Sequence, residues 1–190
     1  MSHVDRMPPL DRAAMTEAQR KVADELAAGP RGGVKGPFIP LLRSPELMDR
    51  LQKVGEYLRF QSSLEPRISE FVMCIVSRDW TQQFEWAVHL PLAVKAGVSP
   101  QAVDSLAEGR RPEAMAKDEA LAYDFCEELL RAKGVSDATY RAAIDQFGER
   151  GVVDMLGVIG YFTTVSMVLN VAHTPAQGGS NLPPLRPLPM

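Results

Sequence analysis

Glu85 and His89 are the residues of this chain whose types and spacing best suit chemistry. They lie four positions apart in the segment RDWTQQFEWAVHLPLAVKAG, residues 78–97, whose composition favours a helix. A four-residue spacing places the carboxylate and the imidazole on one helix face. At about 100° per residue, Arg78 and Gln82 fall within roughly 60° of them. Such a stripe could transfer protons, although an ordinary amphipathic surface helix explains the same spacing.

The elements that would position this stripe are all helical. Alternating strand patterns are missing from the sequence, so it predicts an all-α fold. Cap and stop signals predict helices over 16–28, 44–60, 66–78, 99–109, 118–133 and 149–172, with another beginning at 136. The helix that carries Glu85 should begin at Asp79 or Trp80, and Pro91 should kink or break it just after His89. The glycine-rich segment 29–40 lacks a phosphate-binding motif and is interpreted as a connector.

A second carboxylate, Glu70, lies on the preceding predicted helix. If the two helices pack antiparallel, Glu70 approaches Glu85 and His89. Burial and a neighbouring like charge both raise a carboxylate pKa, so one glutamate could hold a proton for general acid–base catalysis. The three side chains could also hold a metal ion, but the single Glu-x-x-x-His lacks the second ligand set of bundle di-iron sites. We therefore expect no metal.

Length and composition limit the classes of function. The 190 residues, 45% of them hydrophobic, suit a single domain over 1–190. A net charge of −3 without a basic patch argues against nucleic-acid binding. Cys74 and Cys126 lie far apart in apolar helical runs, which suits reduced packing residues. The N-terminal segment lacks an apolar run, so we expect no secretory signal and a cytoplasmic location. Residues 152–172 could span a bilayer by length, but their polar side chains favour a buried helix instead.

Four segments of the chain resemble a known family. They are GPFIPLL (36–42), SPEL (44–47), GEYLRF (55–60) and SRDWTQQFEWAVHLPLAVKAGVS (77–99). Together they resemble the carboxymuconolactone decarboxylase and alkylhydroperoxidase D (AhpD) superfamily of small all-helical proteins. The peroxidase branch has a Glu, eleven residues, then Cys-x-x-Cys-x-x-x-His, and these positions here are Glu70, Gln82, Glu85 and His89. Both cysteines are replaced, so peroxide reduction through a disulfide loses its nucleophile and its resolving thiol.

The resemblance implies an AhpD-like fold of about seven or eight helices, no cofactor, and assembly as a homo-oligomer, either a trimer or a hexamer built as a dimer of trimers. The namesake reaction releases CO2 from a carboxylated lactone and delivers a proton to carbon. The candidate site residues are catalytic His89, Glu85 and Glu70, and substrate-binding Arg78, Gln82 and Trp86. The chain is thus predicted to be a cofactor-free lyase for a small carboxylated or lactone-type substrate.

Two alternatives stay open at this point. One is AhpD-type peroxidase activity, which Cys74 and Cys126 would have to support from outside the motif. The other is a helical oligomer without catalytic activity that binds a small ligand. The proline-rich tail from about residue 174 should be extended or disordered. The tail could be solvated, or its leucines, Leu182, Leu185 and Leu188, could lie across a neighbouring subunit.

Overall fold

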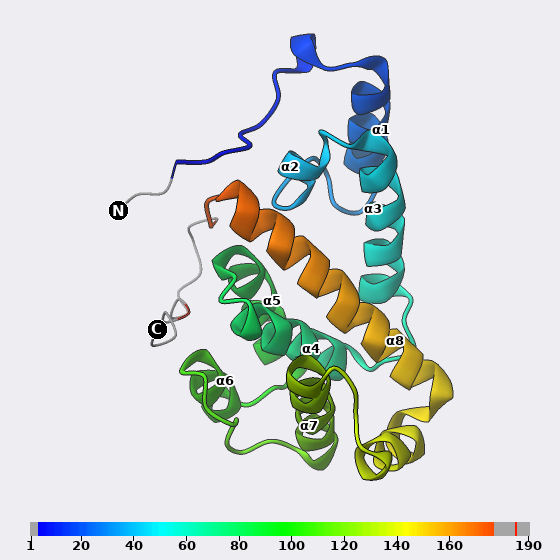
Figure 1. The fold of residues 1–190 in the computed structure, drawn as a ribbon, viewed down its shortest axis with the longest axis vertical. Coiled ribbons are helices and arrows are strands. Elements are labelled where there is room, and N and C mark those ends of the chain that lie inside the picture. The colour runs from blue at the N-terminus through cyan, green and yellow to red at the C-terminus, as the bar shows by residue number, and fades with distance from the viewer. Residues whose placement is uncertain (1–3, 177–184, 186–190) are drawn as a thin grey trace.

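The structure is a computed structural model that describes residues 4–176 and 185. Within this part of the chain it contains eight α-helices, a short 3-10 helix (Arg12–Ala14) and no strand (Figure 1). The α-helices are α1 (Glu17–Ala28), α2 (Phe38–Leu41), α3 (Pro45–Phe60), α4 (Pro66–Asp79), α5 (Gln83–Ala96), α6 (Pro100–Ala107), α7 (Lys117–Ala132) and α8 (Asp137–Ala172). The all-α prediction is confirmed.

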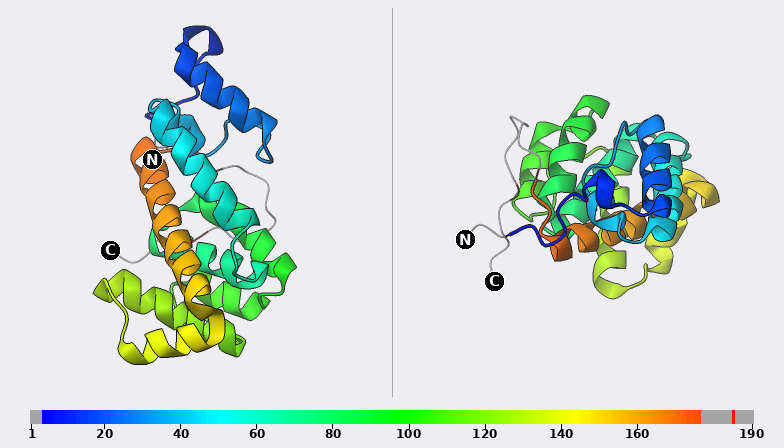
Figure 2. Two further views of the ribbon diagram at one scale, coloured as in Figure 1. Left: turned by 90° about the vertical axis from the view of Figure 1, so that its right-hand side faces the viewer. Right: turned by 90° about the horizontal axis from the view of Figure 1, so that it is seen from above.

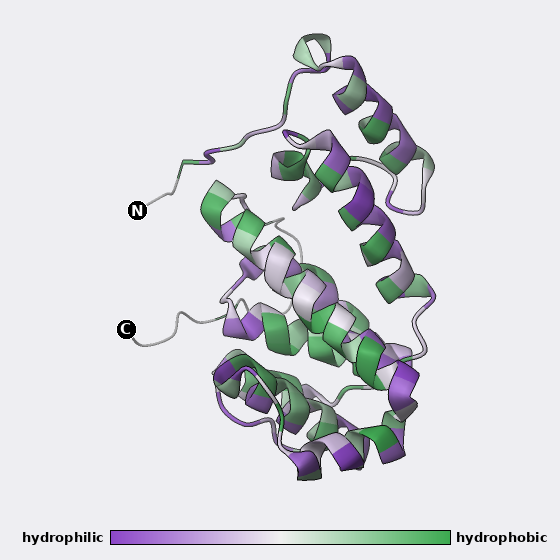
Figure 3. Ribbon diagram, turned by 45° about the vertical axis from the view of Figure 1, so that its right-hand side comes forward, coloured by the Kyte–Doolittle hydropathy of each residue, from purple (hydrophilic) through white to green (hydrophobic). Residues whose placement is uncertain are grey.

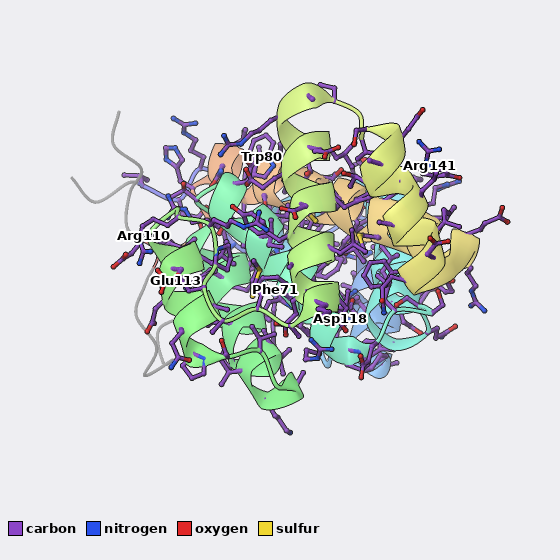
Figure 4. The ribbon with its side chains drawn as sticks, turned by 90° about the horizontal axis from the view of Figure 1, so that it is seen from below. Phe71, Trp80, Arg110, Glu113, Asp118 and Arg141 are labelled. Atoms are coloured by element: carbon purple, nitrogen blue, oxygen red, sulfur yellow. The ribbon has the colours of Figure 1, made fainter. Side chains whose placement is uncertain are left out.

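Helix α8 crosses the middle of the molecule and packs against α3, α4 and α7, while α5 packs along α4 (Figures 1 and 2). The main hydrophobic core lies between these helices and includes Phe71, which Figure 4 shows in the interior. A smaller core around Leu26 and Met48 joins α1 and α2 to α3. Asp118, also labelled in Figure 4, pairs with Arg67 at 2.6 Å and ties the start of α7 to α4.

Helix α8 bends at Gly148, whose φ of 70° and ψ of 168° are not helical. The part before the bend is capped by Ser136 and the part after it corresponds to the predicted helix over 149–172. Figure 3 shows the hydrophobic residues along this second part. The length and composition of α8 as a whole would allow it to cross a membrane, but 56% of its most apolar window is buried inside the protein. In this structure α8 is the central core helix.

The junction between α4 and α5 differs from the sequence prediction. The two helices are separated by a turn in which Thr81 has a positive φ of 48°. The side chain of Gln82 then caps α5 by accepting a hydrogen bond from the Phe84 N–H at 2.6 Å. This cap competes with continued helix before residue 83. The predicted single stripe is therefore wrong, because Arg78 lies on α4 and Glu85 on α5.

Of the predicted kink or break after His89, the break is wrong, because α5 contains Pro91 and continues to Ala96. A proline inside a helix removes one backbone hydrogen bond and costs about 3 kcal/mol or more. Its neighbours Leu90 and Ala93 are completely buried in the main core. Their packing against the rest of the protein offsets the local cost.

The tail contacts its own chain at Leu185, which is 2% exposed. The Gln83 side-chain amide donates to the Leu185 carbonyl at 2.7 Å, and the Leu185 N–H donates to Gln83 Oε1 at 3.0 Å. These bonds hold Leu185 against the start of α5 in its own chain, and the contact with a neighbouring subunit stays a prediction. The corresponding predictions for Leu182 and Leu188 lie outside the described residues.

Candidate active site

Helices α4 and α5 bring the three predicted catalytic side chains together. His89 Nδ1 lies 2.7 Å from Glu70 Oε2, and His89 Nε2 lies 3.4 Å from Glu85 Oε2. The imidazole is 2% exposed, and the Glu85 and Glu70 side chains are 6% and 13% exposed. Each ring nitrogen therefore faces one carboxylate in a largely buried environment.

The surroundings of His89 favour its protonated form. Burial alone would lower the pKa of His89, but hydrogen bonds and charge interactions with Glu70 and Glu85 outweigh burial and raise it above its ordinary value. Phe162 shields one side of the ring, with 4.8 Å between ring centroids and an interplanar angle of 88°. Because an imidazolium donates from both nitrogens, it can satisfy both carboxylates at once. This arrangement can hold a proton and pass it to a glutamate.

The same geometry does not suit a metal ion. The two carboxylates lie on different ring nitrogens, so they do not converge with a free imidazole lone pair on one point. Among residues 4–176 and 185, no group of three or more His, Cys, Asp or Glu side chains could hold a metal.

A cavity of about 410 Å³ lies beside Glu85 and His89, within the size range of small-molecule sites. Its walls come from the loop before α2 and from α2, α3, α5 and α8. The other charged and hydroxyl-bearing residues in its lining are Arg31, Lys35, Arg59 and Tyr161. Four phenylalanines, Phe38, Phe60, Phe84 and Phe162, supply much of the apolar lining. The cavity thus combines basic and aromatic surfaces next to the Glu–His pair.

The basic residues of the cavity were missed in the sequence. Arg31 and Lys35 belong to the glycine-rich segment interpreted as a connector; residues 29–37 do connect α1 to α2, and they also form a cavity wall, which the sequence did not predict. Gly36, with a φ of 55°, lets the loop approach α5 closely, since a Cβ there would lie 2.4 Å from the Phe84 ring. The one sign of this role in the sequence was the presence of two basic residues, Arg31 and Lys35, in a glycine-rich segment.

The three residues predicted to bind substrate are not in the cavity lining. Arg78 is buried elsewhere and donates to the Ala107 carbonyl at 3.2 Å. Gln82 caps α5 and donates to Asn170 Oδ1 at 2.8 Å. Trp86 is 1% exposed and belongs to the main core. The prediction for Arg78 and Gln82 required them to share one helix face with Glu85. The turn between α4 and α5 places Arg78 on a different helix and Gln82 at the cap of α5.

Cys74 and Cys126 are both completely buried, and neither lines the cavity. Burial raises the pKa of each thiol, which reduces the fraction of reactive thiolate at neutral pH. Their position is that of packing residues in the main core.

The described part of the chain is therefore an all-helical protein with a buried Glu–His–Glu group beside a small-molecule cavity. No protein-family model and no curated protein sequence matches the chain. Its structure is similar to the crystal structure of an alkylhydroperoxidase AhpD core, an uncharacterized peroxidase-related protein from Ralstonia eutropha JMP134. The TM-score is 0.73 at 16% sequence identity, over 92% of this chain and 94% of that one. The chain has the AhpD-like fold, as its sequence resemblance implied.

Proposed function

We propose that this protein is a cofactor-free lyase that acts by proton transfer on a small carboxylated or lactone-type molecule. The observation that carries the proposal is the buried Glu70–His89–Glu85 group, whose Glu85 and His89 members line the cavity. A raised His89 pKa keeps a proton available there near neutral pH.

The proposed reaction assigns a step to each of these groups. As the bond between the substrate and its leaving carboxylate breaks, CO2 departs and the electron pair moves into the conjugated lactone as an enolate. Before the reaction Glu70 stabilises the His89 imidazolium. His89 passes its proton to the Glu85 carboxylate, and Glu85 delivers that proton to carbon. One proton from solvent restores the group. Burial raises the pKa of Tyr161 to about 12, so its hydroxyl stays protonated and can donate to the enolate oxygen.

The decisive assay measures CO2 release and deuterium incorporation in D2O with 4-carboxymuconolactone and related carboxylated lactones. Glu85→Gln and His89→Gln should each lower turnover by at least about 100-fold. Arg50→Gln is the matched control, because Arg50 lies on α3 outside the cavity lining and donates to the Glu46 carbonyl. Wild-type turnover by Glu85→Gln would refute the assignment.

Peroxidase activity is the second candidate, because the structurally similar protein is described as peroxidase-related. Here Glu85 occupies a position where the peroxidase pattern has a cysteine, and the two thiols of this chain are buried. Reduction of an organic hydroperoxide that disappears in a Cys74→Ser or Cys126→Ser variant would support this candidate over the lyase.

We also propose that the chain assembles as a homo-oligomer, a trimer or a hexamer built as a dimer of trimers. Four apolar residues of α8 support this, since Val153, Leu156, Met167 and Val171 are each at least 41% exposed and follow helical spacing. Light scattering after size exclusion should give the mass of three or six chains, and a monomer would contradict the proposal.

A further inference from the structure

The guanidinium of Arg31 is held in an unusual position beside the cavity. It stacks over the Phe38 ring, with 4.7 Å from Cζ to the ring centroid, and lies close to the Tyr161 hydroxyl. Its Nε and Nη2 atoms are buried without a hydrogen-bond partner among the residues that the structure describes. Buried donors of this kind are normally paired, so they point to a function.

A second arginine, Arg59 of α3, lines the same cavity. The Arg59 guanidinium is 5.2 Å from the Phe60 ring centroid, and its Nε is also buried without a partner within the described residues. Burial lowers the pKa of Arg31, and the charge of Arg59 lowers it further. The two positive guanidiniums repel each other, and each has a buried N–H without a partner within the described residues. An anion bound between them would offset the repulsion and accept hydrogen bonds from these donors.

The net charge of the whole site is positive. Arg31, Lys35, Arg59 and protonated His89 are four cations, against the two carboxylates of Glu70 and Glu85. The surplus is two positive charges. Glu56, which also acts on Arg31, does not line the cavity and reduces this surplus by at most one.

We propose that Arg31 and Arg59 form a binding site for the carboxylate of a ligand with a flat apolar body, such as an aryl or unsaturated carboxylic acid. A guanidinium matches a carboxylate with two parallel hydrogen bonds. The phenylalanine rings of the cavity then pack on the apolar body, which a free inorganic anion lacks. This carboxylate site deepens the proposed function. It rests on that function for the chemistry at the other end of the ligand.

The bound carboxylate is an anchor and is not the group that leaves as CO2. Pairing with two guanidiniums stabilises the carboxylate relative to neutral CO2, so loss of that group would become harder. The anchor instead fixes the other end of the ligand beside Glu85, which converts the proton transfer into a step within one complex.

The test is a calorimetric titration of the full chain at pH 7 and low salt with benzoate, benzamide and inorganic phosphate. Benzoate should bind the wild type and the Arg50→Gln control equally, and at least about tenfold more weakly to Arg31→Gln and Arg59→Gln. Benzamide and phosphate should bind at least about tenfold more weakly than benzoate. Arg31→Gln should melt no lower than the wild type, because the replacement removes the buried Nε and Nη2 donors that lack a hydrogen-bond partner within the described residues.

Three results would overturn the inference: equal binding of benzamide and benzoate, phosphate binding as tight as that of benzoate, or undiminished benzoate binding by Arg31→Gln.

The Glu85→Gln variant separates this inference from the proposed function. If Glu85→Gln binds benzoate and keeps full turnover, the lyase assignment fails and the carboxylate site stands. If it loses turnover while the wild type does not bind benzoate, the carboxylate site fails and the lyase assignment stands.

Discussion

Replacing His89 by Leu should destabilise the protein by about 3–5 kcal/mol, the usual cost of removing one partner from a buried ion pair. The replacement leaves the Glu70 and Glu85 carboxylates, 13% and 6% exposed, without the imidazole that both of them contact. Leu is close to His in volume, so most of the loss should come from uncompensated charge rather than from a cavity.

A triple variant isolates the charge contribution. Adding Glu70→Gln and Glu85→Gln to His89→Leu removes both uncompensated carboxylates while nearly preserving their shapes. This variant should recover about half of the loss, roughly 2 kcal/mol, because a buried neutral amide costs less than a buried unpaired charge.

The assay is urea unfolding at pH 7, followed by circular dichroism, with the free energy of unfolding taken from linear extrapolation. Arg50→Gln again serves as a control that should stay within about 0.5 kcal/mol of the wild type. The reasoning is refuted if His89→Leu loses less than about 1 kcal/mol, or if the triple variant is no more stable than His89→Leu.

Three further predictions concern pH, packing and thiols. The raised His89 pKa contributes stability that is fully present below about pH 6.5 and is lost as pH rises through the folded-state value, so urea titrations should show a steeper loss above pH 6.5 for wild type than for His89→Gln. Gly55→Ala should weaken benzoate binding in calorimetry, because its Cβ would clash first with the Tyr161 hydroxyl and would lie 2.7 Å from Arg31 Nη2, displacing both side chains of the cavity; unchanged affinity would contradict the packing. Cys74 and Cys126 should react with a thiol reagent only as fast as the protein unfolds, and rapid labelling of the native protein would show that they are accessible.

Local sequence signals predicted many of the helix boundaries. Thr16, Ser99 and Ser136 each accept a hydrogen bond from the N–H three residues later, as their positions before helical segments suggested. The approach of Glu70 to His89 also followed from the sequence, because antiparallel packing of two neighbouring apolar helices limits where their polar faces can meet.

Contacts between distant segments decided the features that the sequence did not reveal. The helix through Pro91 continues because Leu90 and Ala93 pack in the core, and the partners in that packing are remote in sequence. Arg31 reaches the cavity only because its loop folds against α5 and α8, so no local pattern connects it with His89. The resemblance located the Glu–His group, but it did not indicate which cations surround it.

The most direct test of the central claim is a nitrogen-15 NMR titration of the His89 imidazole, assigned by comparison with His89→Gln. The claim is that His89 holds a proton between two glutamates beside the cavity. It predicts a protonation midpoint above 6.5, with both ring nitrogens carrying hydrogen below it, and a lower midpoint in Glu70→Gln. A midpoint at or below 6.5 that is unaffected by Glu70→Gln would contradict the account.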